Sequence, residues 1–436
     1  MKFYNREKEI KLLSKIEQIS FQSAQMTFVV GRRRIGKTSL LSKVYNKDKV
    51  LYFFIAKKNE ALLCEEFIND IQQKLEVPIF GNIKSFKEIF RLLMELSKTK
   101  HFTLVIDEFQ QFFTINPSVF SDMQNIWDSY KETSKINLIL CGSVYSMMMR
   151  IFENSKEPLF GRATQRIHLK AFDLLTLKEI LNDYNKNFSH EDLLAFYLFT
   201  GGVAKYVELL IQKSAFTLEN MIDEIFAENS IFLDEGKNVL IEEFGKEYTN
   251  YFSILSLIAS GKTSRVEIES ILEMQTGGFL SRLENEFGLI KKVRPILAKP
   301  NSRRVKYSIE DNFLSFWFRF IYKNRSAVEA GNLDYIKNIF NRDYKVFSGK
   351  ILEKYFLQKL KQEKKYNLIG TFWDHKNENE IDIVAVNDLQ KKVLFIEVKR
   401  HKKNIKLKVL KEKSKKLWSN FKDYKVDYKG YSLDDM

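Results

Sequence analysis

Eight consecutive residues near the N-terminus have the composition of a phosphate-binding loop. Residues 31–38 read Gly-Arg-Arg-Arg-Ile-Gly-Lys-Thr and match G-x-x-x-x-G-K-[ST] at every fixed position. The glycines let backbone N–H groups approach phosphate oxygens, the lysine reaches the β- and γ-phosphates, and the threonine offers a hydroxyl to Mg²⁺. The arginines fill variable positions, so they either contact phosphate or face solvent. The predicted ATP contacts are Gly31, Arg32, Arg33, Arg34, Ile35, Gly36, Lys37, Thr38 and Ser39.

Two acids at the end of an apolar run supply the rest of the chemistry that a phosphate loop needs. Residues 102–107 read Phe-Thr-Leu-Val-Ile-Asp, and Glu108 follows. Asp107 is placed to hold Mg²⁺ through water together with Thr38, and Glu108 to polarise an attacking water. A later run ends near Ser143, whose hydroxyl either reads the γ-phosphate or belongs to an ordinary Gly-Ser turn. The pattern predicts ATP hydrolysis as well as ATP binding.

A second group of charged residues lies near the C-terminus. Residues 380–386 and 394–399 read as two strands joined by a short polar turn, and they carry Asp382, Glu397 and Lys399. Alternation puts Glu397 and Lys399 on one face, and Asp382 can lie across from them. Two carboxylates at one point can bind Mg²⁺, and a nearby lysine can stabilise charge on an attacked phosphate. On spacing alone, an outward-facing hairpin is the simpler interpretation.

Short apolar runs separated by helical patterns place the phosphate loop in an α/β domain. Such runs are typical of the buried parallel strands of βαβ units. The loop lies between the first run and a predicted helix at 39–45, whose N-terminus faces the bound anion. Residues 176–250 read as a helical lid, punctuated by a turn at 200–202. The predicted strands are residues 26–31, 51–56, 102–107, 136–141 and 166–169.

Two smaller units are expected after the lid. Residues 251–320 read as three helices followed by extended segments around a basic turn, which is the layout of a winged helix. This module either contacts DNA phosphates or binds protein. From residue 348, the order helix, three strands, helix indicates a small α/β unit. The basic residues considered for DNA contact are Arg282, Arg303, Arg304 and Lys306, and the predicted domains are residues 1–175, 176–250, 251–325 and 326–436.

Composition narrows the classes of partner. A net charge of +15 among 436 residues favours a polyanion such as nucleic acid, although a lysine-rich surface also explains it. The two cysteines, Cys64 and Cys141, lack metal-type spacing and read as reduced structural thiols. The N-terminus is too charged for a signal peptide, and no apolar run is long enough to span a bilayer. We therefore expect a cytoplasmic protein without a membrane partner.

Several short motifs together make the chain similar to the archaeal-type ATPases of the STAND group, relatives of AAA+ proteins. This resemblance implies that Arg6 lies near the nucleotide and that Arg162 is an arginine finger or sensor, acting in cis or in trans. On spacing alone, Arg162 reads as a surface arginine. The chain departs from the family at Ala204, where proline is common. The motifs are Asn5-Arg6-Glu7, the arginine-rich loop, Asp107-Glu108, Phe160-Gly161-Arg162 and Thr200-Gly201-Gly202-Val203.

The C-terminal order of elements resembles the PD-(D/E)XK nuclease fold. Its motif residues would be Glu353, Asp382, Glu397 and Lys399, which implies Mg²⁺-dependent DNA cleavage with Asp382 and Glu397 as metal ligands. One hypothesis is therefore an ATP-driven switch coupled to a DNA nuclease, working through oligomerisation. The alternative is an ATP-dependent DNA-binding or protein-scaffolding regulator whose nuclease-like domain is not catalytic.

Overall fold

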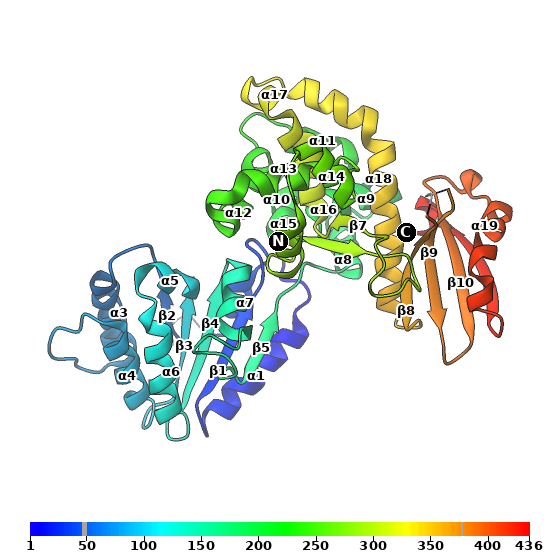
Figure 1. The fold of residues 1–436 in the computed structure, drawn as a ribbon. Helices are drawn as coiled ribbons and strands as arrows, with labels where there is room; N and C mark the ends of the chain where they lie inside the picture. The colour runs from blue at the N-terminus through cyan, green and yellow to red at the C-terminus, as the bar shows by residue number, and fades with distance from the viewer. Residues whose placement is uncertain (46–49, 376–377) are drawn as a thin grey trace. The chain divides into compact units, whose positions relative to one another are not determined.

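The computed structural model describes residues 1–45, 50–375 and 378–436, which divide into two compact units (Figure 1). One unit is Tyr4–Ala171, and the other comprises Met1–Phe3 and Phe172–Met436. Among the described residues, no helix is both long and apolar enough to cross a membrane.

The first unit contains a five-stranded parallel sheet in the order β2-β3-β4-β1-β5. Its central strands are buried along their whole length because helices cover both faces of the sheet. The sheet confirms the predicted P-loop type of α/β fold. The strands are β1 (Gln25–Val30), β2 (Val50–Phe54), β3 (Phe102–Asp107), β4 (Ile136–Gly142) and β5 (Gln165–His168).

Alternation along these strands divides their side chains between two layers of helices. Met26, Leu104 and Leu138 belong to one core together with apolar residues of helices α3, α4, α6 and α7. The alternate residues face the layer that contains α1 and α2. The helices of this unit are α1 (Glu7–Ser20), α2 (Lys37–Val44), α3 (Glu60–Leu75), α4 (Phe86–Leu96), α5 (Phe112–Ile115), α6 (Ser118–Tyr130) and α7 (Tyr145–Glu153).

The second unit begins with five helices over the residues predicted to form a lid. The turn between α9 and α10 has Gly201 and Gly202 at φ values of 54° and 77°. A Cβ on Gly202 would lie 2.3 Å from the carbonyl oxygen of Phe172, so only glycine fits there. The helices are α8 (Leu174–Tyr184), α9 (His190–Thr200), α10 (Ala204–Gln212), α11 (Leu218–Ile225) and α12 (Ile231–Phe244).

Three further helices and an antiparallel strand pair occupy the segment predicted to be a winged helix. The segment joining the two strands packs on the C-terminal sheet, where Ile296 N donates to Thr371 O at 2.7 Å. This segment therefore covers the edge of that sheet, which would otherwise expose unpaired backbone groups. The elements are α13 (Tyr248–Ala259), α14 (Arg265–Leu272), α15 (Gly277–Asn285), β6 (Ile290–Val293) and β7 (Lys306–Ile309).

The C-terminal sheet has the strand order β11-β10-β9-β8. Strands β8 to β10 are antiparallel neighbours, and β11 runs parallel to β10. The helix preceding the sheet is longer than the predicted residues 349–362, because its first half buries Ile336 and Phe340 among the helices of this unit. The elements are α16 (Asn312–Phe316), α17 (Arg325–Glu329), α18 (Leu333–Glu363), β8 (Leu368–Trp373), β9 (Glu380–Asn387), β10 (Lys392–Val398), α19 (Leu407–Ser414) and β11 (Lys425–Tyr431).

Candidate functional site

The phosphate loop joins the end of β1 to the start of α2 and closes around a buried ammonium group. Lys37 is the first residue of α2, and its Nζ donates to the carbonyl oxygens of Gly31 at 2.7 Å and Arg32 at 3.2 Å. Burial lowers the pKa of Lys37. Gly36 has a φ of 96°, and a Cβ on Gly31 would lie 2.8 Å from Leu169 O. The glycines thus permit both the turn and its close packing.

The three arginines of the loop have different surroundings. Arg33 reaches toward the end of β4, where its Nε lies 3.5 Å from the hydroxyl of Ser143. Arg32 is partly buried, whereas Arg34 is exposed and has a φ of 70°. Arg33 and Ser143 therefore lie together at the end of the loop, as a γ-phosphate site would require.

Asp107 ends β3 and is held by several donors. Its Oδ1 accepts from Cys141 Sγ at 3.1 Å and from the backbone N of Glu108 at 2.9 Å. Its Oδ2 accepts a short hydrogen bond from the hydroxyl of Tyr52, and the Thr38 side chain lies close enough to affect the pKa of this tyrosine. The two predicted Mg²⁺ ligands, Thr38 and Asp107, thus lie near the same phenol group.

Glu108 is fixed by two side chains at the same end of the sheet. Its Oε2 accepts from the Ser143 hydroxyl at 2.8 Å and from the amide of Gln110. Gln110 is buried and passes so close to Gly142 that a Cβ there would lie 2.0 Å from Oε1. Glu108 itself has a φ of 55°, an uncommon conformation for a residue with a side chain, and such strain often accompanies functional sites.

The two arginines singled out by resemblance lie at different ends of the sheet. Arg6 is buried, and its guanidinium donates to Lys170 O at 2.7 Å, just beyond the end of β5 and near the start of the loop. Arg162 precedes β5 and pairs with Asp128 at 3.0 Å. Because β5 runs parallel to β1, Arg162 is at the end of the sheet opposite the phosphate loop.

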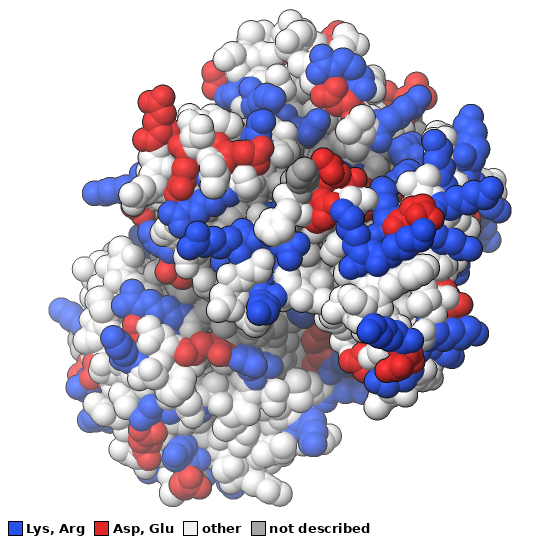
Figure 2. Space-filling model, turned by 45° about the vertical axis from the view of Figure 1, so that its right-hand side comes forward, with Lys and Arg blue, Asp and Glu red and all other residues white. Residues whose placement is uncertain are grey.

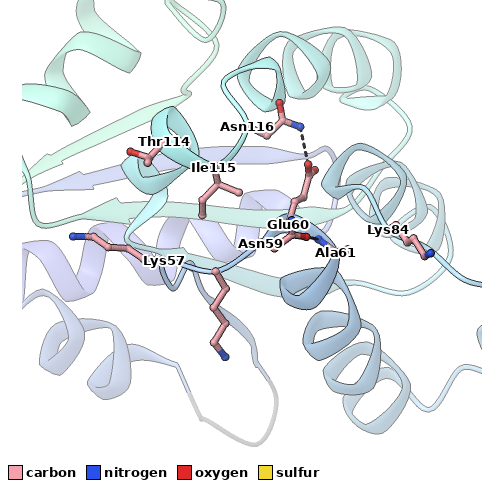
Figure 3. Close-up of a pocket in the computed structure, with 9 residues that line it drawn as sticks. Lys57, Asn59, Glu60, Ala61, Lys84, Thr114, Ile115 and Asn116 are labelled. Atoms are coloured by element: carbon pink, nitrogen blue, oxygen red, sulfur yellow. Dashed lines mark hydrogen bonds between the residues drawn. The ribbon is translucent and has the colours of Figure 1, made fainter.

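A separate pocket of about 610 Å³ opens beside the N-terminus of α3 (Figure 3). The acid within it, Glu60, is already engaged, because it accepts from Asn116 Nδ2 at 2.7 Å and from Phe86 N at 2.8 Å. No residue of the phosphate loop lines this pocket. Its lining residues are Lys57, Lys58, Asn59, Glu60, Ala61, Lys84, Thr114, Ile115 and Asn116.

In the second unit, the predicted C-terminal residues converge. Lys399 Nζ lies 3.2 Å from Asp382 Oδ2 and 3.8 Å from Glu397 Oε1. Backbone amides hold both acids, since Asp382 Oδ2 accepts from Val398 N at 2.7 Å and Glu397 Oε2 from Lys406 N at 2.6 Å. Each carboxylate side chain is only 12% exposed. The arrangement brings two acids and one cation to a single point at the end of β10.

Glu353 of α18 lies within electrostatic reach of this cluster. Lys350 Nζ contacts both of its carboxylate oxygens at 3.1 Å. Burial raises the pKa of Glu353 to about 7; Lys350 opposes this change, whereas the charges of Asp382 and Glu380 add to it. A carboxyl group with this pKa can take up or release a proton near neutral pH.

Relative to the wild type, Glu353→Gln should raise the free energy of unfolding of the metal-free protein more at pH 8 than at pH 5. Between pH 4.5 and about 7 the folded chain holds a proton that the unfolded chain releases, so stability falls as pH rises through this window. Glutamine removes this loss, which is at most about 3 kcal/mol. Thermal unfolding in EDTA at both pH values measures the effect, with Glu412→Gln as an exposed control. An equal shift at both pH values would contradict the raised pKa.

Basic residues of the predicted winged helix make contacts within the unit. Arg282 pairs with Glu247 at 2.7 Å and with Glu286 at 3.2 Å. Lys306 lies 3.6 Å from Glu380 and over the ring of Trp373. These contacts tie α15 to neighbouring residues and β7 to the C-terminal sheet, and both basic side chains keep part of their surface exposed.

Both candidate metal sites provide few protein ligands. Among residues 1–45, 50–375 and 378–436, no group of three or more His, Cys, Asp or Glu is arranged to hold a metal ion. Mg²⁺ often takes only one or two carboxylates and completes its shell with substrate phosphates and water. The pair Thr38 and Asp107, and the pair Asp382 and Glu397, fit that mode of binding.

Three residues around the nucleotide site carry no motif signal in the sequence. Tyr52 and Cys141 contact Asp107, and Gln110 contacts Glu108. Cys141 was expected only as a structural thiol, and it is indeed a buried free cysteine. In the sequence, its contact with Asp107 is indicated only by its position two residues before Ser143, on a strand expected to lie near that of Asp107.

The fold and the loop geometry define the chain as a P-loop ATPase. A family described as an ATPase domain found predominantly in Archaea matches residues 3–210, and a family of archaeal and bacterial proteins of unknown function matches residues 317–416. The uncharacterised protein MJECL04 of Methanocaldococcus jannaschii is 31% identical over 406 residues, covering 91% of this chain and 87% of that protein. The chain belongs to this family of predominantly archaeal ATPases.

One further relative and one solved structure are similar to parts of this chain. The uncharacterised ATP-binding protein MJ1076 of M. jannaschii is 23% identical over 233 residues, covering 45% of this chain and 67% of that protein. The solved Walker-type ATPase PABY2304 of Pyrococcus abyssi superposes with a TM-score of 0.53 at 18% identity, covering 72% of this chain and 96% of that chain. At this identity the likeness concerns the fold alone.

Proposed function

We propose that this ATPase uses its nucleotide state to control a Mg²⁺-dependent DNA nuclease in its C-terminal sheet. The observation that carries the nuclease assignment is the convergence of Asp382, Glu397 and Lys399, with Glu353 in electrostatic reach. The four domains expected from the sequence, including the winged helix, are part of the same proposal.

In the ATP site, each proposed role follows from position. Lys37 neutralises the β- and γ-phosphates from inside the loop, and Arg33 and Ser143 bind the γ-phosphate end. Thr38 and Asp107 would hold Mg²⁺, which when bound neutralises charge on the phosphate oxygens. Glu108 accepts hydrogen bonds beside Ser143 and there orients a water for attack on the γ-phosphate.

Arg162 is proposed to act on the nucleotide of another copy of the chain. It lies at the end of the sheet away from its own phosphate loop, and its side chain is 27% exposed while it pairs with Asp128. An arginine supplied in trans stabilises charge in the transition state and makes hydrolysis depend on assembly. This role implies a homo-oligomer whose turnover rises with protein concentration.

The charge near the acid cluster supports DNA as the substrate. Residues 399–429 contain thirteen Lys and Arg and three Asp and Glu, which accounts for ten of the fifteen net positive charges. Lys and Arg also outnumber Asp and Glu over much of the right-hand side of the view in Figure 2. A basic surface beside paired carboxylates is suited to a phosphodiester backbone.

A partly buried ion pair supports coupling between the lid helices and the acid cluster. Arg400 directly follows Lys399, and its guanidinium donates to Glu191 of α9 at 2.5 Å and to Ser348 of α18 at 2.6 Å. The hydroxyl of Tyr344 also donates to Glu191. A displacement of α9 would therefore act on the end of β10, where Lys399 is fixed.

Asp382→Ala is expected to lower DNA cleavage by more than about 10- to 100-fold, because it removes a proposed Mg²⁺ ligand and even the loss of a group that only orients such a ligand has an effect of that size. Supercoiled plasmid and linear duplex are incubated with Mg²⁺ or Mn²⁺, with ATP, ADP or no nucleotide. Asp427→Ala, which changes an exposed aspartate on the neighbouring strand β11, is the matched control. If wild type and Asp382→Ala cut equally, or neither cuts with any nucleotide, the nuclease proposal fails.

The second candidate is an ATP-dependent DNA-binding or scaffolding regulator without nuclease activity. It is favoured by the position of Lys399, whose ammonium contacts both acids. Salt-dependent DNA binding that persists in Lys399→Ala, without cleavage by the wild type, would support this candidate over the nuclease.

A further inference from the structure

Tyr52 occupies a position between the two groups that the ATPase proposal assigns to Mg²⁺. It lies on β2 opposite Val105 of β3, so Asp107, two residues further along β3, is on the same face of the sheet. Its hydroxyl donates to Asp107 Oδ2, and the Thr38 side chain lies close enough to affect the pKa of this tyrosine. The phenol oxygen therefore links β2 to the end of β3 beside the first turn of α2.

The other oxygen of Asp107 is also fixed. Asp107 Oδ1 accepts from Cys141 Sγ of β4 and from its neighbour's backbone N, at 3.1 Å and 2.9 Å. The carboxylate thus accepts a hydrogen bond from the neighbouring strand on each side, from Tyr52 of β2 and from Cys141 of β4. Its plane and rotation are set by groups that lie outside the phosphate loop.

We propose that Tyr52 is a positioning residue for the nucleotide-bound Mg²⁺, because its hydroxyl sets the orientation of the Asp107 carboxylate beside Thr38. This inference rests on the proposed roles of Thr38 and Asp107. In other metal sites, removing a group that orients a metal ligand commonly lowers metal affinity or activity by about 10- to 100-fold. No nucleotide motif includes this tyrosine.

A packing role for the ring alone would leave the hydroxyl unexplained. Tyr52 is partly buried, and phenylalanine would fill the same space while lacking the one donor that Asp107 Oδ2 uses. A carboxylate that loses a donor in such a site can rotate away from its bound geometry. The change Tyr52→Phe therefore tests the hydroxyl without opening a cavity.

The chain offers a matched control in Tyr45. This residue is another buried tyrosine of the same unit, and its hydroxyl accepts from Asn137 Nδ2 at 3.3 Å. Asn137 keeps a second partner in Thr103 Oγ1 at 3.2 Å. Tyr45→Phe therefore removes a buried hydroxyl that has no contact with Asp107 or Thr38.

Binding of a fluorescent ADP analogue is measured first in EDTA and then as Mg²⁺ is added. In Tyr52→Phe we expect unchanged affinity in EDTA and a Mg²⁺ midpoint raised by about 10- to 100-fold. Tyr45→Phe should match the wild type in both conditions. Loss of the free Mn²⁺ electron paramagnetic resonance signal in the presence of ADP gives a second readout that does not depend on hydrolysis.

Three outcomes would overturn the inference. An unchanged Mg²⁺ midpoint in Tyr52→Phe would show that the hydroxyl does not position the metal ligands. An equal loss of affinity with and without Mg²⁺ would assign Tyr52 a general structural role. If the nucleotide affinity of the wild type does not change when Mg²⁺ or Mn²⁺ is added, the proposed metal site itself is refuted. That result concerns the wild type, whereas the first two outcomes concern the variant, so the failures are distinguishable.

Discussion

Glu108→Gln is expected to bind ATP as the wild type does and to hydrolyse it about 10²- to 10⁴-fold more slowly, the usual contribution of a general base. The amide keeps the size of the carboxylate and retains an oxygen that can accept from Ser143. It lacks the negative charge needed to polarise a water. Phosphate release at saturating ATP measures turnover, and binding of a fluorescent ATP analogue measures affinity.

The matched control for this variant is Glu132→Gln, which changes an exposed glutamate of the same unit. Its turnover and affinity should equal those of the wild type. Unchanged turnover in Glu108→Gln would remove Glu108 from the mechanism. A parallel loss of affinity and turnover would instead show that the hydrogen bonds of Glu108 with Ser143 and Gln110 maintain the shape of the binding site.

Lys37→Ala is expected to abolish the stabilisation that nucleotide confers. A ligand at 100 times its dissociation constant stabilises the folded state by about 2.7 kcal/mol, and this increment should disappear. Without nucleotide the variant should be at least as stable as the wild type. Burial disfavours the charged form of Lys37 and lowers its pKa, so the folded chain bears a cost that bound phosphates would offset.

Thermal unfolding with and without ADP or ATP tests this expectation. Lys43→Ala, which removes an exposed lysine from the same helix, should retain the full nucleotide-dependent shift. A shift that survives in Lys37→Ala would mean that the ammonium held by Gly31 and Arg32 is not a principal contact of the phosphates.

Much of the first unit could be predicted from sequence because its signals are local. Four of the five strands are largely apolar runs, whereas β5 is mostly polar, and the structure places every one within about two residues of its expected bounds. The loop is recognisable because its chemistry restricts neighbouring positions along the chain. The convergence of Asp382, Glu397 and Lys399 was also predictable, since strand alternation and a short connection bring these positions together.

The supporting residues could not be predicted because they depend on register and tertiary packing. Tyr52 reaches Asp107 only because β2 and β3 pair with Tyr52 opposite Val105, and no local pattern specifies that register. The pairing of Arg400 with Glu191 joins residues more than two hundred positions apart. Likewise, Glu247, which pairs with Arg282, lies outside the helix that carries the arginine.

The length of helix α18 determines how a movement at one end of the helix reaches Glu353. With 31 residues and a rise of 1.5 Å per residue, it is a rod of about 46 Å. Its first half is buried among helices, and its second half carries Glu353 to the C-terminal sheet. The rod contains no proline, and Gly349, one turn before Glu353, is its one intrinsically weak position. If the first half of α18 tilts and the helix stays straight, Glu353 moves with it. Bending of the helix at Gly349 would reduce that movement.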